Sequence, residues 1–213
     1  ADAITNGDGG KVIVWSDDAT RAYGSISVTG GSQGGNGGFV EVSGKSQLDF
    51  AALVNTSAPK GRAGTLLLDP QDLTISDTVS TNNSELNAGV PTGEPAGSIF
   101  FVDASSNFTI SDEVLEAQTG NIVLQATRDI TVNSNLSGGG LVLTSPAQRL
   151  TLQAGRHITI GSPITTTGGA IILEADSPHA PTSTSSDGRK PADGIGQLSI
   201  QQALNSGGGA ITL

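Results

Sequence analysis

Two segments of the chain match each other closely at a fixed separation. Residues 124–136, LQATRDITVNSNL, are followed 28 positions later by residues 152–164, LQAGRHITIGSPI. In both copies short runs of apolar residues alternate with polar ones, as expected of half-buried β-strands. A repeat of about 20 to 30 residues built from such strands is typical of a solenoid, whose units bury their apolar faces only by stacking on neighbours. The repeat therefore predicts an all-β solenoid.

The same pattern recurs elsewhere in weaker form. Residues 9–14 return 28 positions later as residues 37–42, and residues 164–173 return 40 positions later as residues 204–213. The longer second separation has an evident source, because the polar, proline-containing run 177–191 lies within it and is typical of a surface loop. Without that loop the separation returns to about one coil.

Composition agrees with a single stacked domain. The 213 residues include 30 glycines, and only 3% of residues are aromatic against 35% hydrophobic overall. Stacked coils fill a narrow interior with ladders of Ile, Val and Leu, so few aromatic residues are needed. We expect one solenoid over residues 1–213, interrupted by loop insertions around 76–98 and 176–195. Residues 111–117 begin with a serine cap followed by helix formers and predict a single helical turn.

Charge and composition exclude several partners and cofactors. The chain has 20 acidic and 10 basic residues and a net charge of -10, which disfavours nucleic-acid binding. No apolar run approaches the roughly 20 residues that span a bilayer. Cysteine is absent, so neither disulfides nor thiolate metal sites contribute. We expect no nucleic-acid partner, no membrane insertion and no cofactor.

Four ordered motifs carry a resemblance to a known family. They are residues 9–17, 23–28, 37–45 and 63–70. Together with the later repeats they resemble the segment that follows the secretion domain in filamentous-haemagglutinin-like exoproteins, which are bacterial adhesins exported by two-partner secretion. The resemblance implies a right-handed parallel β-helix, a role in cell adhesion, and a location outside the cell or on the bacterial surface. The Asn-Pro-Asn motifs of the secretion domain itself do not occur, so the resemblance is to the passenger segment downstream of it.

The expected function follows from extension of the stack. Eight or nine coils at ~4.8 Å each give a rod on the order of 40 Å long, which would hold more distal regions away from the cell. Residues 209–213 stop within an expected strand, and we expect a fragment of something longer or an end covered by a neighbour. Two other readings stay open: a self-assembling extracellular fibre, in which coils stack end to end, and a carbohydrate-active β-helix enzyme.

Acidic residues provide the first candidates for chemistry. Asp8, Asp17 and Asp18 lie near glycines and are reminiscent of a calcium site. The tandem Gly-Asp nonapeptide of such sites is absent, so we expect solvated corner residues. Asp69 and Asp72 are the kind of acidic pair found in polysaccharide-cleaving β-helices. Because the proline between them is typical of a turn, we expect no catalytic role.

Basic residues and loops complete the candidates. His157 takes the place of Asp129 in the sister repeat, which predicts an exposed corner position, and His179 is far from it in sequence. Arg128 and Arg156 fall at matching positions and predict an external ladder. We expect no catalytic, cofactor-binding or metal-binding residue. Contacts with host, cell-surface or polysaccharide partners are expected through the loops, and end-to-end self-association through the strands.

Overall fold

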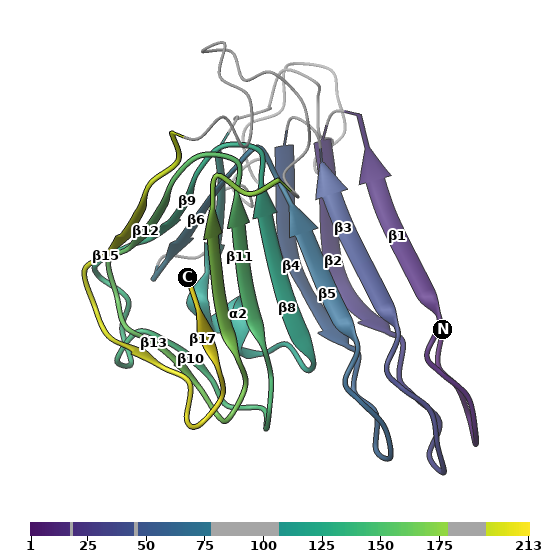
Figure 1. Cartoon of the computed structure of the whole chain (residues 1–213). Helices are drawn as coiled ribbons and strands as arrows, with labels where there is room; N and C mark the ends of the chain where they lie inside the picture. The colour runs from purple at the N-terminus through teal and green to yellow at the C-terminus, as the bar shows by residue number, and fades with distance from the viewer. Residues whose placement is uncertain (18, 45–46, 78–106, 179–194) are drawn as a thin grey trace, which may run out of the picture.

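The computed structural model describes residues 1–17, 19–44, 47–77, 107–178 and 195–213 (Figure 1). The expected loop insertions around 76–98 and 176–195 lie almost wholly outside the described residues. The described chain is mostly β-structure, and every strand pairing in it is parallel. The expectation of an all-β fold is confirmed at this level.

Four parallel sheets are formed by the described residues. The largest has the order β1 (Lys11–Ser16), β3 (Phe39–Gly44), β5 (Thr65–Asp69), β8 (Asn121–Ala126), β11 (Leu150–Ala154), β14 (Ile171–Ala175) and β17 (Ile211–Thr212). The second has the order β15 (Leu198–Ile200), β12 (Ile158–Ile160), β9 (Ile130–Val132), β6 (Asp72–Ser76) and β7 (Asn107–Ser111). The third contains β10 (Leu141–Leu143), β13 (Ile164–Thr166) and β16 (Leu204–Asn205), and the fourth contains β2 (Ala19–Ser27) and β4 (Gln47–Asn55).

The chain visits these sheets in a repeating order. From β8 it passes to β9 in the second sheet and β10 in the third, and it returns to the first sheet at β11, beside β8. The next passage, through β12 and β13 to β14, repeats the order. We call one such passage a circuit. Figure 1 shows the strands of successive circuits lying side by side from the N-terminal to the C-terminal end.

Strand register confirms the repeats read from the sequence. Leu124 pairs with Leu152 and Ile130 with Ile158, so the two matching segments are neighbouring strands in two different sheets. The weaker repeats are also in register, because β1 pairs with β3 at an offset of 28 and β13 with β16 at an offset of 40. Residues at matching positions of the repeats are therefore the residues that stack on each other in neighbouring strands.

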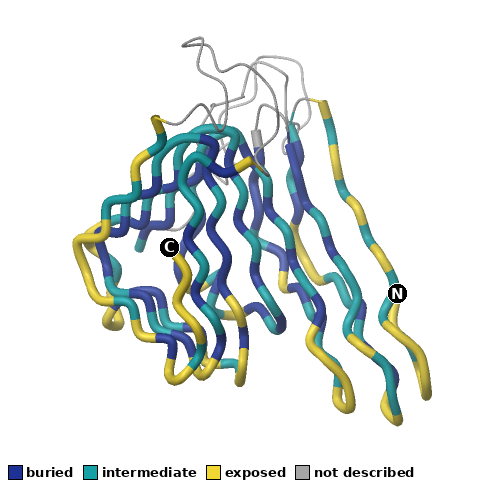
Figure 2. The backbone as a smooth tube through the Cα atoms, viewed as in Figure 1, coloured by how far each residue is buried: buried dark blue, intermediate teal, exposed yellow. Residues whose placement is uncertain are grey.

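The core is a set of aliphatic ladders that run from circuit to circuit. One ladder contains Leu68, Leu124, Leu152 and Leu173, all fully buried. Figure 2 shows the alternation of buried and partly exposed residues along these strands. Burial of each such side chain contributes roughly 1.5 to 3 kcal/mol, so stacking of circuits provides most of the favourable free energy.

Glycine pairs mark a corner where successive circuits touch through their backbones. A Cβ on Gly38 would lie 2.0 Å from the carbonyl oxygen of Gly10, and one on Gly64 would lie 2.0 Å from that of Gly38. Both distances are far below carbon–oxygen contact. The recurrent glycines of the motifs at 9–14, 37–42 and 63–70 are therefore explained by close backbone approach.

A short helix confirms the helical turn expected at residues 111–117. In α2 (Asp112–Glu116) the Ser111 hydroxyl caps the helix by accepting from the Val114 N–H at 3.3 Å. Leu115 is fully buried in the core. Glu116 Oε1 accepts from the Val142 N–H of β10 at 2.7 Å, so α2 satisfies a backbone donor at the edge of the third sheet.

The length of the stack differs from the expected eight or nine coils. The largest sheet of the described residues has seven strands, and six spacings of ~4.8 Å give about 29 Å between its first and last strands. Part of the difference comes from β7, which follows residues outside the described part of the chain. Instead of adding a strand to the first sheet, it pairs with the side of β6 that faces away from β9.

Candidate functional site

A groove of about 710 Å³ runs along one side of the protein, next to the projecting loops. Its walls come from the loop joining β4 to β5, the turn before β8, the loop joining β10 to β11 and the turn before β14. Figure 1 shows the loops before β1, β3 and β5 projecting together at the lower right. The groove lies where the last of these loops meets the later circuits.

The charged side chains that line the groove are both arginines. The backbone N–H of Arg62 donates to Asn36 Oδ1, and that of Arg149 donates to Asn121 Oδ1, each at 3.0 Å. Asparagines of the preceding circuit thus fix both backbones. Within the described part of the chain, neither guanidinium forms a salt bridge. In a chain of net charge -10, this groove is suited to anionic groups.

Amide chemistry adds to the polar character of the groove. Gln148 lines it but is 99% buried, and its Nε2 donates to the carbonyl oxygen of Gln118 at 3.1 Å. Its Oε1 has no hydrogen-bond donor among the residues described. The described residues that line the groove include none of the usual general bases, His, Cys, Asp or Glu. The two arginines and the Gln148 amide give the groove groups that can bind anions and hydrogen-bonding ligands.

The predicted arginine ladder exists, and it is built from ion pairs between circuits. Arg128 forms a bidentate pair with Asp72, with Nε 3.0 Å from Oδ1. Arg156 pairs with Asp129 in the same way one circuit later, with Nε 3.1 Å from Oδ1. The four side chains are only 16 to 33% exposed, so the ladder is more buried than an external one would be. Each arginine is paired with the circuit before it.

His157 belongs to the same corner. The Asp129 N–H donates to Asp72 Oδ1 and the His157 N–H donates to Asp129 Oδ1, each at 3.2 Å. The Gln197 N–H donates to His157 Nδ1 at 3.1 Å. His157 is half-buried rather than exposed as expected, and the bond from Gln197 connects its ring to the next circuit. Histidine can replace aspartate at this position because each offers an acceptor to a backbone N–H of the next circuit.

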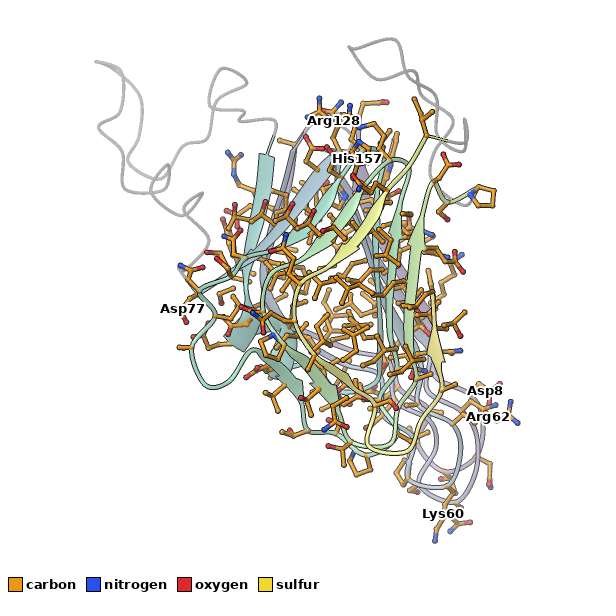
Figure 3. All side chains as sticks on the ribbon, turned by 60° about the vertical axis from the view of Figure 1, so that its left-hand side comes forward. Asp8, Lys60, Arg62, Asp77, Arg128 and His157 are labelled. Carbon is orange, nitrogen blue, oxygen red and sulfur yellow. The ribbon has the colours of Figure 1, made fainter. Side chains whose placement is uncertain are left out.

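The other acidic candidates are placed apart. Asp8 and Asp17 are exposed at opposite ends of β1, and Asp18 lies outside the described residues, as does His179. Asp8 Oδ1 accepts from the Asn36 N–H at 2.6 Å, so it is a corner acceptor. Figure 3 shows Arg128 and His157 at one end of the circuits and Asp8 and Arg62 at the other.

Asp69 and Asp72 also have different environments. Asp72 is paired with Arg128, whereas Asp69 Oδ1 is buried with no hydrogen-bond partner in the described structure. Burial, and secondarily the nearby charge of Glu41, raises the pKa of Asp69 from 3.8 to about 6. Asp72 therefore belongs to an ion pair between circuits, whereas Asp69 is electrostatically perturbed.

Comparison with known proteins adds no identification. No known protein family matches the chain, and no curated protein matches it significantly. Among the described residues there is no helix with the length and apolar character needed to cross a membrane.

Proposed function

We propose that the chain is a right-handed parallel β-helix and serves as a non-enzymatic shaft segment of a large secreted or cell-surface bacterial adhesin. The observation that carries the proposal is the shared register of the repeats in three sheets. A chain that returns to the same sheet one strand further on, circuit after circuit, is extended by each repeat. The right hand is supported by the strong preference of parallel crossover connections for that hand.

The repeated residues support a mechanical role. Leu124, Ala126 and Ile130 recur as Leu152, Ala154 and Ile158, and all six are fully buried. The polar residues that recur, such as Arg128 and Arg156, pair with the neighbouring circuit. What the repeat preserves is packing between circuits, which is what a shaft requires. The adhesin context rests on the resemblance of the four N-terminal motifs.

Duplication of one repeat tests the shaft architecture. A second copy of residues Gln125–Leu152 inserted after Leu152 offers each new strand the neighbours that the original strand has. We expect a folded protein whose maximum dimension in small-angle X-ray scattering is larger by about 5 Å. An unfolded or aggregated product, or an unchanged dimension, would argue against a stack that extends by whole circuits.

Two further measurements address function and location. Incubation with acidic polysaccharides should produce no new reducing ends, and cleavage would overturn the non-enzymatic assignment. Antibody labelling of intact bacteria should detect the segment on the surface or in the medium. Detection only after lysis would contradict the adhesin proposal.

Self-assembly into a fibre is the second candidate. In the described structure β1 pairs with β3 and β17 with β14, each on one edge, so a further parallel strand can pair with the other edge. Ile211 in β17 is 43% exposed although its register partner Ile171 is buried. Open parallel edges of this kind favour end-to-end pairing. A strictly monomeric species in light scattering at high protein concentration would exclude this candidate.

A further inference from the structure

Three carboxylates meet where the second sheet ends beside α2. Asp77 follows β6, and Asp112 and Glu113 form the first turn of α2. Ser76 pairs with Ser111 in the strand register, so the next residues, Asp77 and Asp112, follow at the same edge. One oxygen from each of the three carboxylates lies within 4.8 Å of the others. Figure 3 places Asp77 away from the Arg128 and His157 corner.

Asp112 is the unusual member of this cluster. The residue is 97% buried, and its Oδ1 has no hydrogen-bond partner within the described structure. A buried carboxylate oxygen without a donor is unfavourable unless a cation or proton compensates it. Among the described residues, no Lys, Arg or His forms a salt bridge with any of the three carboxylates. A bound cation can supply this compensation at a pH where the carboxylates are ionised.

The pKa values of Asp112 and Asp77 are shifted in opposite directions. The pKa of Asp112 is raised to about 6, chiefly by burial and in smaller part by Glu113 and Glu116, against the opposing effect of a backbone hydrogen bond. The Ser137 N–H donates to Asp77 Oδ1 at 3.1 Å, and hydrogen bonds from Ser137 lower the pKa of Asp77. These hydrogen bonds favour the charged form of Asp77.

We propose that Asp77, Asp112 and Glu113 form a calcium site that fastens α2 to the end of β6. Ca²⁺ binds carboxylate oxygens at about 2.3 to 2.6 Å, so two oxygens on one ion can be up to about 5 Å apart, as they are here. Asp77 and Glu113 are accessible to solvent, which leaves room for water to complete the coordination shell. Mg²⁺ fits less well because it requires shorter bonds and stricter geometry.

Binding would act on the part of the fold that α2 covers. Glu116, in the same helix, accepts from the backbone N–H of Val142 at the edge of the third sheet. An ion at Asp77, Asp112 and Glu113 therefore connects the end of the second sheet to the helix that closes the third. Calcium would stabilise this junction against local opening.

Calorimetric titration of chelator-treated protein with CaCl2, at pH 7.5 and constant ionic strength, tests the site. We expect one site with an affinity in the range of about 10⁻⁴ to 10⁻³ M, as in extracellular calcium modules. At 10 mM CaCl2, mass action should raise the melting temperature by about 5 °C. MgCl2 should give a clearly smaller shift. Equal shifts with both ions would overturn the assignment to calcium.

Two variants and a control locate the ion. Asp112→Asn should abolish the calcium-dependent shift without lowering the melting temperature of the calcium-free protein, because it removes the buried charge. Glu113→Gln changes a solvent-exposed side chain and should weaken binding at least 10-fold even if the first variant does not fold. Glu41→Gln removes an acidic group near Asp69 and should keep the full response. No calcium response in the unaltered protein, or equal responses in all variants, would refute the site.

Discussion

Asp69→Asn should stabilise the protein above pH 6 and have little effect below pH 4. Asp69 ends β5 with one carboxylate oxygen buried and unpaired in the described structure. Burial and the charge of Glu41 raise its pKa from 3.8 to about 6 in the native state. Between these values the native state keeps a proton that the unfolded state has released, so the free energy of unfolding falls as pH rises.

The magnitude follows from the size of the shift. A rise of about two pKa units corresponds to about 3 kcal/mol of stability lost between pH 4 and pH 6 and absent at higher pH. The introduced amide does not ionise, and its N–H2 group can donate to Glu41. The variant should therefore equal the unaltered protein near pH 3.5 and exceed it by up to about 3 kcal/mol at pH 7.5.

Urea unfolding followed by circular dichroism at several pH values is the suitable assay. Asp17→Asn is the matched control, because it removes one negative charge from an exposed position and should change stability by less than about 0.5 kcal/mol. Glu41→Gln should give a smaller stabilisation than Asp69→Asn, since it removes only the second cause of the shift. Parallel stability curves for Asp69→Asn and the unaltered protein from pH 3.5 to 7.5 would refute the reasoning.

Substitutions at Gly64, Arg128 and His157 test the contacts between circuits, and each is measured by urea unfolding. Gly64→Ala should lower the free energy of unfolding by more than about 3 kcal/mol, because the new Cβ would lie 2.0 Å from a backbone oxygen. The control Gly138→Ala, in open space at φ +64°, should lower it by only about 1 kcal/mol. Similar losses in the two variants would contradict the close approach. Arg128→Met should lose about 2 kcal/mol by leaving its half-buried carboxylate partner unpaired, and a neutral result would show that the pair contributes nothing. His157→Ala should lower the free energy of unfolding by about 1 kcal/mol and speed hydrogen exchange at the Gln197 amide, because the acceptor is lost. His157→Asp should keep the stability and the slow exchange of the unaltered protein. Equal behaviour of the two variants would exclude the acceptor role.

The repeats made much of the fold predictable from sequence. Leu124 and Leu152 match because they stack, and the same holds for Ile164 and Leu204, so the periodic pattern contains the strand register itself. The helical turn after Ser111 was predictable because capping is a local interaction. Local and periodic signals of this kind need no knowledge of distant contacts.

The acidic cluster and the groove could not be predicted in the same way. Asp77 meets Asp112 because β7 pairs with the free side of β6, and no repeat marks that pairing. The groove arises where loops before β5, β8 and β11 differ in length, which alignment of the strands does not reveal. The half-buried state of His157 depends on a bond to Gln197, which lies 40 residues away.

The hydrogen bonds from backbone to side chain at the corner of Asp72, Asp129 and His157 all run in one direction along the chain. Side chains of Asp72, Asp129 and His157 accept from the backbone N–H groups of residues that come later in sequence, as Asp8 does from Asn36. A folded circuit therefore presents acceptors that are already in place for the circuit that follows it. A chain delivered from its N-terminus, as in synthesis or export, could fold onto this template as it emerges, with each finished circuit setting the register of the next.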